Sequence, residues 1–194
     1  MMEAFAPTEP EAFPKAMTLE ECLELQRQLP HIRFEYLDGM VYEMPGGTRK
    51  HERVCVNLVT MLDSFLEKHS CQVFPSGLSL EFEDREGYFY PDVMVECPPG
   101  EEDYALNPVL IVEVLSPSTQ MYDLRTKKEV YLTIRSLRHL LFVDPRNVYI
   151  EHYFRSDETA VWQFECITTL EAELYLLLWD LRIPLTKIYR NVAV

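Results

Sequence analysis

One acidic residue inside an apolar segment constrains this sequence most strongly. Glu113 interrupts five apolar residues between Val109 and Val114, a run that otherwise predicts a buried β-strand. An ionised carboxylate in apolar packing costs several kcal/mol unless it is paired with a cation or bound to a metal. We therefore expect a positive partner, a shared proton or a metal ion beside Glu113.

A second acid, Asp92, is expected to lie opposite Glu113. Both residues lie in strand-like segments, and symmetric pairing about the intervening turn places residue 92 opposite residue 113. Opposed residues of an antiparallel pair share a face, with Cβ atoms roughly 4.5–5.5 Å apart. Two negative charges about 5 Å apart repel by roughly 3 kcal/mol at an effective dielectric constant of about 20. The pair must share a proton, hold a divalent cation or face a fixed positive charge.

A divalent cation is the strongest candidate, and Mg²⁺ suits the pair best. It is bound by carboxylates, waters and phosphate oxygens, and Mn²⁺ is a possible substitute. The sequence indicates no cluster of histidines or cysteines near the acids, which argues against zinc. Lys127 lies on the helix predicted after Glu113, where its ammonium group would orient or polarise a water that attacks phosphorus.

The helix predicted around Lys127 is locally basic in an acidic chain. From residue 123 to residue 138 the basic residues outnumber the acidic ones by three, with Arg125, Lys127, Lys128, Arg135 and Arg138 against Asp123 and Glu129. The whole chain has 18 Lys and Arg against 32 Asp and Glu, a net charge of −14. This charge argues against binding of nucleic acid or anionic membranes over a large part of the surface. A polyanionic partner would bind only at a locally basic segment.

Each of these residues also has a purely structural interpretation. Asp92 follows a proline and would then cap a strand, and Glu113 would be a buried acid that an arginine satisfies. Lys127 stands four residues after Asp123, a spacing that is also typical of an ordinary surface ion pair. The coincidence of all three features within 36 residues, from 92 to 127, favours a functional site.

Composition predicts one domain at residues 17–194 after a flexible tail at residues 1–16. The chain has 194 residues, 47% of them hydrophobic, which is enough for a sizeable core. Its five cysteines are odd in number and form no C-x-x-C pair, so we expect reduced thiols in a cytoplasmic protein. No apolar run approaches the roughly 20 residues that span a bilayer, and no signal peptide is indicated.

Periodicity and turn signals predict an α+β fold, a mixed sheet with flanking helices. Helices are expected from Thr18 to Leu29, from Thr48 to His69 and from Gln120 to Leu137, and hairpins at Asp38-Gly39 and around residues 144–147. Strands at 78–82, 87–95 and 109–115 have short connections, which predict an antiparallel meander. A further strand is expected at 160–167, and the end of the chain is expected to pack back or dock a partner.

Three spaced motifs resemble a known family. The segments YPDVMVE, VEVLSPST and DLRTKKEVY resemble, in that order, the Uma-type restriction endonuclease family of the PD-(D/E)XK nuclease superfamily. FEYLDG, the histidine at 51 and LLFVDP extend the resemblance over about residues 17 to 190. The superfamily's usual lysine, two residues after the second acid, is Leu115 here, and Lys127 resembles its migrated replacement.

The resemblance implies a restriction-endonuclease-like fold and roles for several residues. Asp92, Glu113 and Lys127 would be catalytic, and the two acids, with the carbonyl of Val114, would bind Mg²⁺. Glu35 would complete the metal shell or position water, although a solvent-facing strand carboxylate is its alternative. His51 would bind substrate or orient an acid, with a satisfied histidine at the start of a helix as its alternative, and Tyr131 is expected only to pack in the core. From the basic segment itself we expect Arg125 and Lys128 to bind substrate phosphates.

The implied activity is that of a metal-dependent endonuclease that hydrolyses DNA, as a possible homodimer. One alternative is a non-catalytic interaction module that retains the nuclease fold, which the charge of −14 favours somewhat. Another is a nuclease that acts on RNA. The presence of both acids and the lysine favours catalysis, because a site that had lost its function would be free to lose them.

Overall fold

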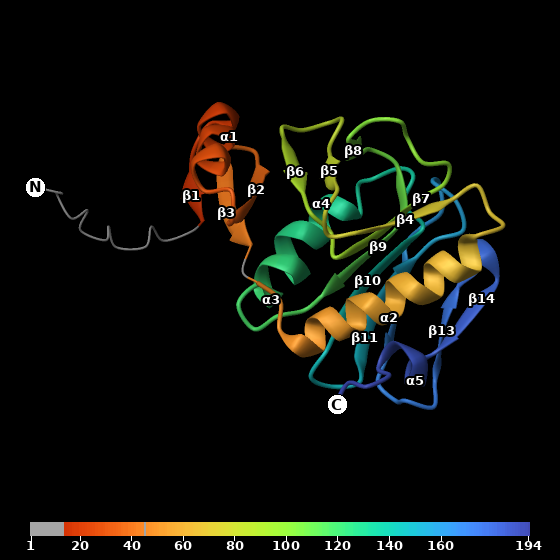
Figure 1. Cartoon of the computed structure of the whole chain (residues 1–194). Helices are drawn as coiled ribbons and strands as arrows, with labels where there is room; N and C mark the ends of the chain where they lie inside the picture. Colours follow the sequence, from red (N-terminus) through yellow and green to blue (C-terminus); the bar gives the residue numbers. More distant parts are fainter. Residues whose placement is uncertain (1–13, 45) are drawn as a thin grey trace, which may run out of the picture. The chain divides into compact units, whose positions relative to one another are not determined.

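The computed structural model describes residues 14–44 and 46–194, which form an α+β fold (Figure 1). Their contacts divide the chain into two compact units. Unit 1 contains the described residues up to Met44 together with Phe82–Tyr88, and unit 2 contains residues 46–81 together with Phe89–Val194. The single domain expected at 17–194 remains a prediction. Within the described part of the chain, no helix combines the length and apolarity needed to cross a membrane.

Unit 1 contains a short helix and a hairpin whose signals were readable in the sequence. Helix α1, Leu19–Gln28, begins after Thr18, which forms a capping box with Glu21. Strands β2, Arg33–Leu37, and β3, Met40–Met44, pair across a turn in which Asp38 and Gly39 both have positive φ. Both the predicted helix and the predicted hairpin are confirmed.

Two short strands extend this hairpin on its two sides. Strand β1, Lys15–Ala16, pairs with β3, and strand β6, Gly87–Phe89, pairs with β2 through Tyr88 and Gly87. Of the tail expected at residues 1–16, residues 1–13 lie outside the described residues.

Unit 2 is built on a six-stranded mixed sheet. Its order is β12-β11-β10-β9-β7-β4, and β9 and β10 are its parallel pair. The strands are β4 (Gln72–Pro75), β7 (Val93–Glu96), β9 (Pro108–Val114), β10 (His139–Asp144), β11 (Tyr149–Phe154) and β12 (Gln163–Ile167). The unit also contains a parallel pair of strands, β5 (Ser79–Glu81) and β8 (Tyr104–Ala105), and a hairpin of β13 (Glu173–Leu176) and β14 (Leu181–Pro184). It is completed by the 3-10 turn Leu177–Trp179 and helix α5 (Leu185–Ile188).

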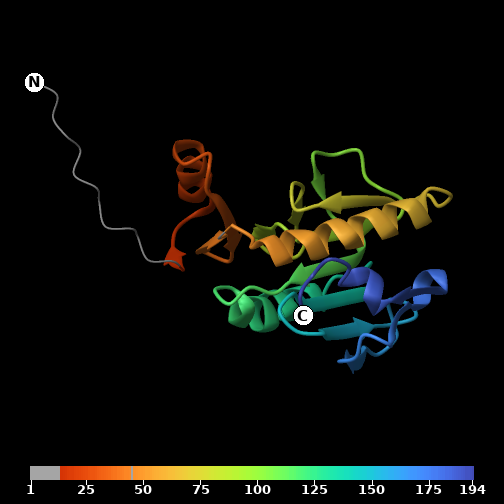
Figure 2. The ribbon, with the colours of Figure 1, turned by 60° about the horizontal axis from the view of Figure 1, so that its bottom comes forward.

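Helix α2, Arg49–Leu66, covers one face of this sheet (Figures 1 and 2). It begins after Thr48, whose hydroxyl accepts a hydrogen bond from the amide of His51. A buried stripe at four-residue spacing, Val54, Leu58, Leu62 and Leu66, packs in a cluster with strand residues such as Val112 and Val114. Because side chains alternate along a strand, Glu113 points to the opposite face. The C-terminal hairpin and α5 join the same core, so the end of the chain packs back.

The predicted meander is only partly correct. Strands β7 and β9 pair antiparallel as expected. The segment at 78–82, however, forms β5, which pairs in parallel with β8, and the run at 87–95 is interrupted by Pro91 before β7 begins. Proline lacks an amide N–H and ends the ladder at that point.

The helix expected at 120–137 is also much shorter. It consists of α3 (Gln120–Tyr122), a π-helical turn (Asp123–Lys127) and α4 (Lys128–Tyr131). The guanidinium group of Arg155 donates hydrogen bonds to the carbonyls of Ile134, Arg135 and Leu137. These carbonyls are therefore satisfied without helical bonds, which allows the chain to turn into β10.

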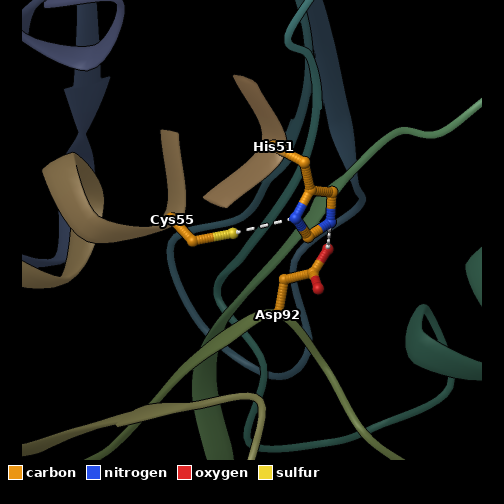
Figure 3. A group of neighbouring side chains, drawn as sticks. All are labelled: His51, Cys55 and Asp92. Atoms are coloured by element: carbon orange, nitrogen blue, oxygen red, sulfur yellow. Dashed lines mark hydrogen bonds and ion pairs between the residues drawn. The ribbon is translucent and has the colours of Figure 1, made fainter. Parts of the chain in front are cut away.

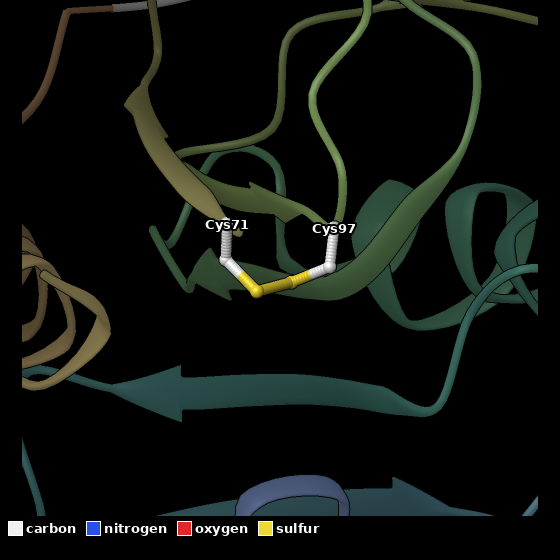
Figure 4. Close-up of a disulfide and its surroundings, with 2 residues drawn as sticks. All are labelled: Cys71 and Cys97. Carbon is white, nitrogen blue, oxygen red and sulfur yellow. A yellow bond between two sulfur atoms is a disulfide. The ribbon is translucent and has the colours of Figure 1, made fainter. Parts of the chain in front are cut away.

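The expectation that all cysteines are reduced is wrong. Cys71 and Cys97 form a disulfide (Figure 4). Strands β4 and β7 pair Gln72 with Glu96, and the next pair outward consists of the two cysteines. The sequence did not indicate β4, so this register could not be recognised. Cys22, Cys55 and Cys166 are free.

Candidate active site

Strands β7 and β9 bring the two predicted acids together. Val93 pairs with Val112, so the next residues outward along the same register are Asp92 and Glu113. Asp92 lies just before β7, and its Oδ2 accepts a hydrogen bond from the amide of Val114 at 2.7 Å. Asp92 is thus tied to the strand that carries Glu113, and the direct opposition of the two acids remains a prediction.

Glu113 is buried, and its partners lie on the segment that follows its strand. The ammonium group of Lys127 lies 3.0 Å from Oε1 of Glu113, and the hydroxyl of Tyr131 donates to the same oxygen at 2.6 Å. Both partners are buried as well. The expected positive neighbour is therefore a lysine, where the structural alternative had an arginine.

A π-helical turn presents Lys127 to the acid. π-Helical turns are rare and are frequently found at functional sites. The Lys127 ammonium group also lies 3.7 Å from Oδ1 of Asp123, and 5.6 Å and 5.7 Å from the ring centroids of Phe89 and Tyr122. Because the side chains of Lys127 and Asp123 are both buried, the alternative of an ordinary surface pair is wrong.

Asp123 has an unusual environment for a carboxylate. Burial raises its pKa, while the charge of Lys127 and a hydrogen bond from Thr119 oppose that shift. The Thr119 hydroxyl donates to Oδ2 of Asp123 at 2.8 Å. Thr119 stands at the start of α3 without a side-chain capping bond, and its hydroxyl instead satisfies an acid whose charge is costly to bury.

The first turn of α2 brings His51 to Asp92 (Figure 3). Nε2 of His51 lies 3.1 Å from Oδ2 of Asp92, and Nδ1 lies 3.5 Å from Oε1 of Glu52. Burial alone would lower the pKa of His51, but the hydrogen bond and charge of Asp92, helped by Glu52, raise it overall. The structure therefore places His51 where it holds Asp92.

Cys55, one turn further along α2, completes a group of three different donors. Its Sγ lies 3.7 Å from Nδ1 of His51, and one donor atom each from His51, Cys55 and Asp92 lies within 4.8 Å of the others. The expectation that no histidine or cysteine gathers near the acids is therefore wrong. Burial, and then the charges of Asp92, Glu52 and Glu113, raise the pKa of the Cys55 thiol. Three carboxylates thus impose a negative potential at this corner, which suits a cation.

The other predicted site residues differ in burial. Glu35 is buried on β2 in unit 1, so its solvent-facing alternative is wrong and its catalytic role remains a prediction. Arg125 is exposed on the π-helical turn, whereas Lys128 is half-buried and its ammonium group lies 5.5 Å from the ring centroid of Tyr153. Val114 contacts Asp92 through its amide, and its predicted role as a carbonyl ligand remains untested.

Sequence reasoning missed two residues of this site. Tyr131 was expected only to pack in the core, yet it donates to Glu113. Its position four residues after Lys127 would have placed both side chains on one helical face. Cys55 stands four residues after His51, a spacing that signals a shared face in the same way.

The mixed sheet with its flanking helices is a restriction-endonuclease-like fold. A solved structure titled "putative nuclease belonging to DUF820", from Anabaena variabilis, superposes with a TM-score of 0.71 and 20% sequence identity. The match covers 89% of this chain and 97% of that one, and at this identity it establishes the fold alone.

The chain belongs to the Uma2 family, which is described as "Putative restriction endonuclease" and whose model matches residues 19–184. Two uncharacterized proteins of Synechocystis sp. are similar to it. One is 34% identical over 160 residues, 81% of this chain and 82% of that protein. The other is 33% identical over 144 residues, 72% of this chain and 81% of that protein.

Proposed function

We propose that this protein is a divalent-metal-dependent endonuclease that hydrolyses phosphodiester bonds in DNA. The observation that carries the proposal is the 3.0 Å contact between Lys127 and Glu113, with Asp92 hydrogen-bonded to the amide of the next residue, Val114. A buried lysine held against one of two neighbouring acids supplies a cation-binding pair and a proton-handling group in one place. Membership of the family supports the same conclusion.

Asp92 and Glu113 would hold Mg²⁺, or Mn²⁺ in its place, with the carbonyl of Val114 as a further oxygen donor. The residues fit such an ion because the donors are hard oxygens and because three carboxylates make the corner negative. When bound, the ion supplies Lewis-acid stabilisation of charge that develops on the phosphoryl oxygens. It also offsets the repulsion between the two carboxylates.

Lys127 would act on the attacking water, because its ammonium group is already fixed between Glu113 and Asp123. A preorganised cation in a buried site stabilises developing negative charge without the cost of reorientation. Tyr131 and His51 are positioning residues in this proposal. Tyr131 would hold the Glu113 carboxylate from one side, and His51 would hold Asp92 from α2.

DNA would approach over the basic segment that carries Lys127. Arg125 is exposed there and would contact a phosphate, and Lys128 would add a second positive charge. Because the whole chain has a net charge of −14, we expect binding to be local and sensitive to salt. Glu35 remains a proposed additional acid of the site, and a homodimer remains a proposed assembly.

The proposal is tested by incubating supercoiled plasmid with the protein and Mg²⁺, Mn²⁺ or a chelator. We expect metal-dependent nicking or linearisation that is lost in Asp92→Ala, Glu113→Gln and Lys127→Ala. Lys68→Ala, which removes an exposed charge near the end of α2, serves as the matched control and should retain activity. Cleavage that survives all three substitutions, or a folded wild type that is inactive in every metal, would reject the proposal. A parallel single-stranded RNA substrate tests the RNA alternative.

A further inference from the structure

We propose that His51, Cys55 and Asp92 form a second metal site, selective for zinc or a similar thiophilic divalent ion. One donor atom from each residue lies within 4.8 Å of the other two (Figure 3). The site shares Asp92 with the proposed magnesium site but takes its other two ligands from α2. Its existence does not depend on nuclease activity.

The three donors are of the kinds that zinc binds. Imidazole nitrogen, thiolate sulfur and carboxylate oxygen are all common zinc ligands, whereas Mg²⁺ makes little use of sulfur or nitrogen. Three protein ligands leave one position of a tetrahedral ion for water. The His51–Cys55 pair therefore changes the ionic preference of a corner that otherwise offers only oxygen.

The helix geometry brings two of the donors together. His51 and Cys55 are four residues apart on α2, so their side chains lie on the same face, and Sγ is 3.7 Å from the imidazole. Nε2 of the same ring lies 3.1 Å from Asp92. Donors around one tetrahedral zinc ion are separated by roughly 3.3–3.7 Å, so the cluster must contract by at most about 1.5 Å. The Cys55 thiol, whose Sγ now contacts Nδ1, would turn toward the Nε2 side of the ring to bind the ion.

Glu52 provides a hydrogen-bond acceptor for the ring nitrogen that does not bind the ion, a partner that zinc-bound histidines usually have. When Nε2 binds the ion, Nδ1 carries the ring proton, and Oε1 of Glu52 lies 3.5 Å from Nδ1. A carboxylate in this position fixes the tautomer of the ring and increases its strength as a ligand. On binding, the Cys55 S–H bond breaks, its proton passes to solvent, and the sulfur electron pair forms the bond to zinc.

Occupancy of this site would engage Asp92, which is also a proposed magnesium ligand. Zinc would therefore compete with Mg²⁺, and this regulatory consequence rests on the proposed nuclease function. The binding itself is measured without any activity assay.

Cobalt(II) is the probe, because a cobalt–thiolate bond produces a charge-transfer absorption band. Chelator-treated protein is titrated with Co²⁺, and we expect the wild type to develop this band with one equivalent of ion and to lose it on addition of Zn²⁺. Cys55→Ser should abolish the band, and Cys166→Ser, which alters an exposed free cysteine on β12, should retain it. Glu113→Gln should also retain the band while losing plasmid cleavage, which separates this site from the proposed magnesium site.

A second measurement needs no variant. Alkylation of Cys55 by iodoacetamide, quantified by mass spectrometry, should slow at least about tenfold when zinc occupies the thiolate. Absence of the cobalt band in the wild type, a band that persists in Cys55→Ser, or alkylation of Cys55 that zinc does not slow would each overturn the proposal.

Discussion

The hydroxyl of Tyr131 lies 2.6 Å from Oε1 of Glu113, the oxygen that also binds the Lys127 ammonium group. Removal of this hydroxyl leaves a buried carboxylate with one donor fewer. We expect Tyr131→Phe to lower the free energy of unfolding by about 1–3 kcal/mol, because an incompletely satisfied buried acceptor keeps its desolvation cost. Urea titration at neutral pH measures the change, and equal stability of both proteins would contradict the structural role of the bond.

The Lys127–Glu113 pair predicts strong coupling between two substitutions. Lys127→Met alone should destabilise the protein by about 3–5 kcal/mol, because it removes the ammonium group that faces the buried carboxylate of Glu113. The double variant Lys127→Met/Glu113→Gln should recover a large part of this loss, since the uncompensated charge is also removed. A double-mutant cycle by urea denaturation gives the coupling energy. If the effects of the two substitutions on the free energy of unfolding were additive, the two side chains would not be energetically coupled, which would contradict the buried ion pair.

Two buried histidines predict a loss of stability in acid. Nδ1 of His139 lies 2.9 Å from Nε2 of His152, whose Nδ1 lies 2.8 Å from Glu165. Burial lowers the pKa of His152 to about 4, and burial, followed by the charges of His152 and Arg138, lowers that of His139 to about 3. The unfolded chain therefore takes up these protons more readily than the folded protein does.

The contribution of these neutral histidines to the free energy of unfolding is fully present above their ordinary pKa of about 6.5. It is lost as the pH falls below that value. The loss by pH 5 is about 2 kcal/mol per histidine. His51 contributes with the opposite sign, because its pKa is raised and its contribution is lost as pH rises. We expect urea denaturation to give a net lower free energy of unfolding at pH 5 than at pH 7. Constant stability between these values would contradict the buried, neutral state of the pair.

The disulfide predicts a simple count of thiols. Under denaturing conditions without reductant, only the three free cysteines, Cys22, Cys55 and Cys166, should react with a thiol reagent, and all five should react after reduction. Cys71→Ser should lower stability by about 2–4 kcal/mol, a typical value for the loss of a native disulfide. Five reactive thiols before reduction would show that the bond is absent in solution.

The sequence was sufficient to place the central acids but not the side chains that surround them. The antiparallel pairing of the strands that follow Asp92 and carry Glu113 was predictable, although its register shifts between Val95 and Glu96. The π-helical turn cannot be recognised in the same way, because one inserted residue hardly changes an apolar pattern of short length. Tyr131 was therefore predicted to be a core residue, although its hydroxyl donates a hydrogen bond to Glu113.

Contacts between distant elements were the least predictable. His51 meets Asp92 only because α2 packs along the sheet, and helix packing is not encoded in local periodicity. The disulfide was missed for a related reason. Strand β4 is only four residues long, and its pairing with β7 determines which cysteines meet.

The most direct test of the central claim is a calorimetric titration with Mn²⁺ of the wild type and of variants that remove one acid each. The wild type should bind one ion between Asp92 and Glu113, and Asp92→Asn and Glu113→Gln should each weaken binding by at least about tenfold. Asp63→Asn, which neutralises an exposed acid on α2, should bind as the wild type does. Wild-type protein that binds no Mn²⁺, or variants that bind it with unchanged affinity, would contradict the claim that these two carboxylates hold a divalent ion.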